Sequence, residues 1–104
     1  MLLAVANLLA KIAPGDARVK FYRAVAAILQ KQNSAESEKL LRDYLQNAPV
    51  RSGYPRSDAA HYWLGKWFEN SGNIAGARGE YEVAVKEEPR NKLAQEALKK
   101  LKKG

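Results

Sequence analysis

The side chains best suited to catalysis or metal binding are few in this chain. There is a single histidine, His61, and no cysteine, so neither a thiolate nucleophile nor a cysteine metal site can form. Asp43 and Asp58 have no visible partner that would tune a pKa for acid–base work. There is no glycine-rich phosphate loop and no His, Asp and Glu spacing typical of a metal site. The sequence therefore predicts a protein that is not an enzyme and that needs no cofactor and no metal.

Basic residues outnumber acidic ones, and part of the excess lies at the C-terminal end. Lys and Arg total 18 against 11 Asp and Glu, which gives a net charge of +7. A solvated lysine-rich helix face accounts for this pattern, and a surface for RNA or an acidic membrane is the alternative. The lysines considered for such a surface are Lys66, Lys92, Lys99 and Lys100. Single-strand binders usually combine basic and aromatic side chains, and the last helical segment has no aromatic residue, so neither nucleic acid nor membrane is an expected partner.

Apolar residues recur at helical spacing along most of the chain. We expect helices at residues 2–12, 16–31, 34–47, 57–71, 74–87 and 91–102. Residues that can accept a backbone N–H precede or begin four of them, namely Asp16, Ser34, Ser57 and Asn73. Gly72 suits the left-handed conformation that ends a helix. The apolar first helix is too short to span a bilayer and lacks the flanks of a secretory signal, so the sequence predicts an all-α protein.

The stretch 58–91 combines small and large residues at a characteristic spacing. These are Leu64, Gly65, Phe68, Ala77, Tyr81 and Pro89. The pattern resembles the tetratricopeptide repeat (TPR), a helical hairpin of about 34 residues. In that family, small residues let the paired helices approach closely, which is the role the resemblance implies for Gly65. His61 stands where the family prefers Trp, so the resemblance implies that it is a packing residue.

A more divergent copy precedes this repeat. A shift of 40 residues aligns identical residues in four places: Tyr22 with Tyr62, Asn33 with Asn73, Ala35 with Ala75 and Pro49 with Pro89. We therefore interpret residues 1–104 as one domain, divided into a half repeat (1–15), a repeat (18–51), an insertion (52–57), a repeat (58–91) and a capping helix (92–102). The face of the capping helix is expected to carry Leu93, Ala97, Leu98 and Leu101. The resemblance implies a right-handed array of about six antiparallel helices.

In the resembled family, the first helix of each repeat lines a concave groove that commonly binds peptides. The resemblance places these residues there: Val19, Tyr22, Ala26, Leu29, Gln30, Ala59, Tyr62, Lys66, Glu69 and Asn70. Exposed tyrosines are enriched in interfaces, and Tyr22 and Tyr62 share one register; the alternative is that both cover apolar neighbours and bind nothing. Chaperone-binding members hold a carboxylate with Lys and Asn, but Tyr22, Ala26 and Trp63 stand at those positions here, so that clamp is not present.

The function expected from this resemblance is a non-catalytic protein–protein interaction module that binds a peptide or helix of unidentified sequence. The alternative is self-association, or packing on another part of a longer protein, because the apolar first helix lacks the partner that would precede it in a complete repeat. A homodimer would then form through that N-terminal helix. The composition is that of a soluble protein, with the cytoplasm slightly favoured.

Overall fold

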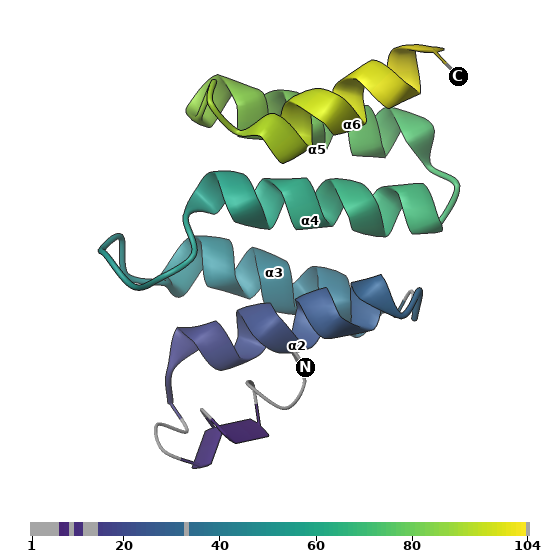
Figure 1. The fold of residues 1–104 in the computed structure, drawn as a ribbon. Coiled ribbons are helices and arrows are strands. Elements are labelled where there is room, and N and C mark those ends of the chain that lie inside the picture. The colour runs from purple at the N-terminus through teal and green to yellow at the C-terminus, as the bar shows by residue number, and fades with distance from the viewer. Residues whose placement is uncertain (1–6, 9, 12–14, 33, 104) are drawn as a thin grey trace. The chain divides into compact units, whose positions relative to one another are not determined.

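Helices make up all the regular structure that is described. The computed structural model describes residues 7–8, 10–11, 15–32 and 34–103. Its helices (Figure 1) are α2 (Ala17–Leu29), α3 (Ala35–Asn47), α4 (Ser57–Asn70), α5 (Ile74–Glu87) and α6 (Lys92–Lys103). Residues 7, 8, 10 and 11 are also helical. The predicted all-α class is confirmed, whereas most of the predicted helix 2–12 and of the half repeat 1–15 lies outside the described residues.

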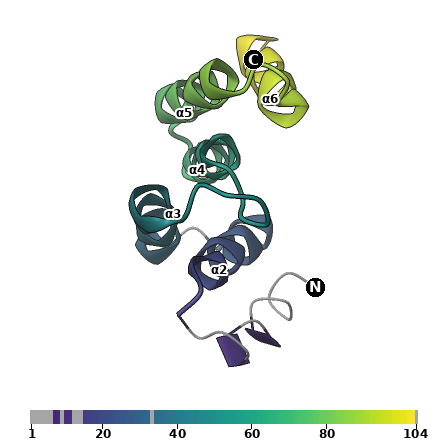
Figure 2. The same ribbon diagram turned by 90° about the vertical axis from the view of Figure 1, so that its left-hand side faces the viewer.

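The chain forms two compact units, of which the first ends at Pro55 and the second begins at Arg56. In the first unit, α2 packs against α3 as an antiparallel hairpin. In the second unit, α4 and α5 form a like hairpin, and α6 packs beside α5 (Figure 2) in the antiparallel direction (Figure 1). None of the helices described is long and apolar enough to cross a membrane.

Side-chain caps begin most of these helices. Three predicted N-caps are confirmed, each accepting a backbone N–H of its first turn: Asp16 from Arg18, Ser34 from Ser37 and Asn73 from Gly76. The prediction for Ser57 is wrong, because Arg56 is the N-cap residue and Ser57 is the first helical residue of α4. Arg56 is extended there and bonds to Asp58 in the first turn, where a carboxylate is stabilised by the helix dipole.

Two helices end in the same hydrogen-bonded turn with different residues. After α4, Gly72 has a φ of +79°, and its N–H and that of Asn73 bond to the carbonyls of Glu69 and Phe68. This is the turn that a left-handed residue closes most easily. After α2, the left-handed position belongs to Lys31, with a φ of 59°.

Replacing Lys31 by glycine should stabilise the first unit. A side chain in the left-handed conformation costs roughly 1–2 kcal/mol, a strain that glycine does not have. Glycine also loses more entropy on folding, so we expect a net gain of about 0.5–1 kcal/mol. Chemical denaturation of the full chain measures it, with Lys39→Gly, within α3, as a control that should destabilise. If the Lys31→Gly variant is no more stable than the wild type, the left-handed conformation does not strain the backbone at Lys31.

The core of the second unit brings together residues from all three of its helices. Its buried members are Tyr62, Ala77, Tyr81, Ala84, Ala94 and Ala97, and Trp63, Phe68, Val85, Leu98 and Leu101 pack against them while partly exposed. The expected inner face of α6 is wrong at one position, because Leu93 is 62% exposed and Ala94 is buried instead. Position 94 lies on the same stripe as Ala97 and Leu101 at helical spacing. The large residues predicted for the core, Phe68 and Tyr81, both contribute to it.

Candidate functional site

On α2, the residues predicted to line a groove divide into buried and exposed ones. Val19 and Ala26 are buried in the core of the chain. Tyr22 is partly exposed, Leu29 is 57% exposed and Gln30 is exposed. Tyr22, Ala26 and Leu29 follow one another at helical spacing and therefore share a face. The exposed part of this face thus consists of one aromatic and one aliphatic side chain.

The surface of the first unit is hollowed next to this face. A hollow of about 230 Å³ lies between the end of α2 and the start of α3. Its lining includes Ala26, Ala27 and Leu40, with the polar side chains of Arg23 and Gln30. Most of the side chains that line it are polar, so the hollow is a mainly polar depression beside this face.

On α4, the predicted groove residues also differ in exposure. Tyr62 is only 8% exposed, because its ring belongs to the core formed with α5 and α6. Ala59, Lys66 and Glu69 are partly exposed, and Asn70 is exposed. The Lys66 ammonium lies 5.7 Å from the centre of the Tyr62 ring, within the range of a cation–π contact.

Glu69 has a structural role in addition to its exposed position. Its carboxylate accepts a hydrogen bond from the hydroxyl of Tyr81, which is fully buried. Burial and this hydrogen bond raise the pKa of Tyr81 well above its usual value. The phenol therefore stays neutral and donates to the carboxylate, so Glu69 already has a hydrogen-bond partner within the second unit.

His61 lies between carboxylates that the sequence analysis did not connect with it. Its Nδ1 is 2.7 Å from Glu80 Oε1, and its Nε2 is 3.8 Å from Glu87 Oε2. The Ser57 hydroxyl donates to Glu87 and not to the imidazole. A serine nucleophile needs a hydrogen bond to its base, so this arrangement ties α4 to α5 but does not form a nucleophile–base pair.

Residues 52–55 of the predicted insertion 52–57 lie in the first unit, where Gly53 and Tyr54 contact the start of α2. The Arg18 guanidinium donates to the carbonyl of Gly53 at 3.1 Å and lies 4.5 Å from the centre of the Tyr54 ring. A second guanidinium, that of Arg51, lies 5.1 Å from the same centre. The Arg18 hydrogen bond also holds the pKa of Asp16 at about 2, so the N-cap of α2 is ionised at neutral pH.

Tyr44 of α3 holds the end of the same loop. Its hydroxyl donates to the carbonyl of Pro55 at 2.6 Å. Burial raises its pKa to about 12, so the donor proton is retained at all moderate pH values. Together with Arg18, this residue gives the loop a fixed position against the hairpin of the first unit.

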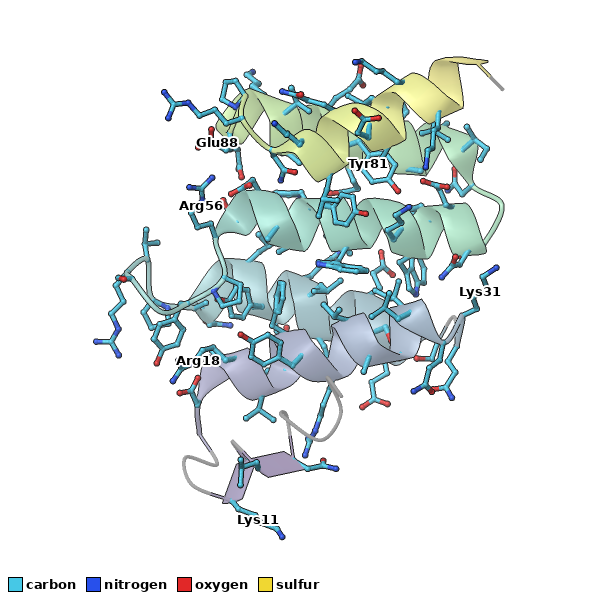
Figure 3. All side chains as sticks on the ribbon, in the orientation of Figure 1. Lys11, Arg18, Lys31, Arg56, Tyr81 and Glu88 are labelled. Atoms are coloured by element: carbon cyan, nitrogen blue, oxygen red, sulfur yellow. The ribbon has the colours of Figure 1, made fainter. Side chains whose placement is uncertain are left out.

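A polar cluster in the second unit joins the starts of α4 and α6 and the end of α5. Asp58, 7% exposed, accepts from Arg56 at 3.0 Å and from Asn91 at 2.8 Å. Arg56 also pairs with Glu88 at 2.9 Å, and both are labelled in Figure 3. Asn91 Oδ1 accepts the backbone N–H of Ala94 in the first turn of α6. The expectation that Asp58 has no partner is therefore wrong. Arg56 lies only two residues away in the sequence, whereas Asn91 is 33 residues away and reaches Asp58 only in the fold.

The electrostatics of Asp58 follow from this cluster. Burial disfavours its charged form, but the hydrogen bonds from Arg56 and Asn91 outweigh that penalty and lower its pKa. The charged carboxylate is therefore a structural link between helices. No three His, Asp or Glu side chains among the described residues are grouped so as to hold a metal ion.

Comparison of the chain with protein-family models, with curated proteins and with solved structures finds no match. The tetratricopeptide assignment therefore rests on the residue pattern of the sequence and stays a prediction. The residues described above form two exposed surfaces. On α2 the surface carries an aromatic and an aliphatic side chain, and on α4 it carries a basic and an amide side chain.

Proposed function

We propose that this chain is a non-catalytic protein–protein interaction module of the tetratricopeptide kind. Its partner is a peptide or helix of another protein. Contacts come from the exposed side chains of α2 and α4, the first helices of the two hairpins. Tyr22 and Leu29 provide apolar area, and Lys66 and Asn70 provide polar contacts.

The observation that carries the proposal is the exposure of Leu29. A leucine more than half exposed lacks a large part of the favourable free energy of burial, which is about 1.5–3 kcal/mol for complete burial of a side chain of this size. It lies on the predicted groove face, one turn from Ala26, which lines the hollow. A scattered apolar residue needs no explanation, but an exposed leucine sharing a face with Tyr22 beside a hollow supports an interface.

Tyr62 is buried, so a substitution at this position would affect folding as well as binding. Truncating Tyr62 would damage the core of the second unit, and lost binding would then report lost folding. Leu29 and Lys66 are better positions, because each projects at least partly into solvent. Each lies in a different unit, so the two faces can be tested separately.

Leu29→Asp and Lys66→Glu should each weaken capture of the partner at least about tenfold, the effect of losing one central contact of about 1.4 kcal/mol. The measurement compares proteins retained by the immobilised full chain and its variants from an extract of the source cells. Val50→Asp, at a fully exposed valine outside the predicted face, is the matched control. A protein that all four chains retain equally would count against these faces as the interface.

A further inference from the structure

We infer that the face of the α4–α5 hairpin covered by α6 is a helix-binding surface, and that α6 of a second copy of this chain can occupy it. The inference is independent of the faces proposed above for a partner protein. It starts from the composition of the core of the second unit. The hairpin supplies the large rings of Tyr62 and Tyr81, and α6 supplies mainly the small side chains of Ala94 and Ala97.

The two tyrosines form the receiving surface. Their ring centres are 5.8 Å apart with the planes inclined by 40°, and Trp63 stands edge-on against Tyr62. Alanines at positions 94 and 97 allow the α6 backbone to come close to these rings, and Leu98 and Leu101 extend the contact. The surface therefore fits an amphipathic helix with small residues three apart, followed by leucines.

α6 has the properties of a helix that can leave this surface. Its buried residues are two alanines, whose burial contributes less than that of a leucine or an aromatic ring, and its Leu98 and Leu101 are only partly buried. Its solvent face includes Lys92, Lys99 and Lys100, which keep a released amphipathic helix hydrated. The Asn91 side-chain amide donates to Asp58 of α4, and release of α6 would also break this bond. Release thus costs a limited set of contacts.

A second copy is the occupant that these observations favour. Its α6 would reproduce the core contacts made by the native one. The connecting segment 88–91, which carries the bonds of Glu88 to Arg56 and of Asn91 to Asp58, has to change conformation. Such exchange of an identical element is a low-cost route to a dimer. A tethered helix has an effective concentration in the millimolar range, so the monomer prevails in dilute solution and exchange requires concentrated protein.

The first test measures binding of a labelled peptide of residues 88–103 to the full chain. Ala97→Glu, at a buried position, should release the resident helix and bind the peptide at least about tenfold more tightly than the wild type, because the surface is no longer occupied. Lys99→Glu, on the solvent face of α6, is the control and should bind like the wild type. Circular dichroism verifies that each variant is helical.

Leu101→Asp, at a partly exposed position of α6, provides a second released variant if Ala97→Glu does not fold. In the second test, the wild-type chain is concentrated to the millimolar range, warmed and cooled. After dilution, light scattering measures the molar mass of the monomer and of any dimer. A slowly dissociating dimer that Ala97→Glu or Leu101→Asp cannot form is the expected result. If a folded variant does not bind the peptide more tightly than the wild type, the α4–α5 face is not a helix-binding surface. If the wild type stays monomeric, a second copy is not the occupant.

Discussion

Replacing Gly65 by alanine should destabilise the chain by about 1–3 kcal/mol, the usual cost of overpacking. In the middle of a helix this change normally stabilises, by about 1 kcal/mol. Here a Cβ at position 65 would lie 2.6 Å from Cδ1 and 2.8 Å from Cζ of Tyr81. That ring cannot move aside, since it is fully buried and its hydroxyl is bonded to Glu69. Denaturant unfolding of the full chain measures the loss.

Gly79 provides a matched control for this prediction. It also lies inside a helix of the second unit, α5, but no atom lies within 4 Å of a Cβ added there. Gly79→Ala should therefore stabilise by about 0.5–1 kcal/mol. Opposite signs for the two substitutions would support the close packing of α4 on α5, and a stabilising Gly65→Ala would contradict it.

Asp58→Ala should also destabilise the chain by about 1–3 kcal/mol. The substitution removes the acceptor shared by Arg56 and Asn91 and leaves the part-buried Asn91 amide without this bond. It also weakens the start of α6, since Asn91 caps that helix. Arg56→Ala is the control: Arg56 is largely exposed, and exposed ion pairs contribute only about 0–1 kcal/mol.

The loss of unfolding free energy caused by Asp58→Ala should depend on pH, and it should be smaller in acid. The pKa of Asp58 is lowered in the folded chain from the ordinary value of 3.8. A lowered pKa contributes stability that is present above pH 3.8 and is lost as the pH falls through the folded value. The difference between the two proteins should therefore be full at pH 6 and shrink as the pH falls below 3.8. A deficit that stays constant down to acidic pH would show that the charge of Asp58 does not contribute.

The sequence predicts those features of the fold that depend on residues close together in the chain. Helical periodicity predicted the bounds of α5, and local side-chain caps predicted the starts of α2, α3 and α5. Gly65 was predicted as a point of close helix packing, and the Tyr81 ring beside it agrees with that expectation. These features depend on residues within one hairpin, whose spacing can be inferred from the chain itself.

The sequence was insufficient where distant residues meet. Asp58 and Asn91 are 33 residues apart, and nothing in their local sequence pairs them. Tyr62 was assigned to an exposed groove, but α6 covers it in the core, because a helix near the end of the chain closes over the second hairpin. The apolar stripe of α6 was misjudged at Leu93, since helical spacing alone allows two neighbouring stripes that share Ala97.

The most direct test of the proposed function is site-specific crosslinking. A photoreactive amino acid is placed at position 29, 66 or 50 of the full chain, and covalent adducts are identified after illumination in the source cells. We predict that positions 29 and 66 form adducts with the same partner protein, whereas position 50, a fully exposed valine, does not. Adducts at position 50 alone, or none at positions 29 and 66, would contradict the proposal that the exposed faces of α2 and α4 bind a partner.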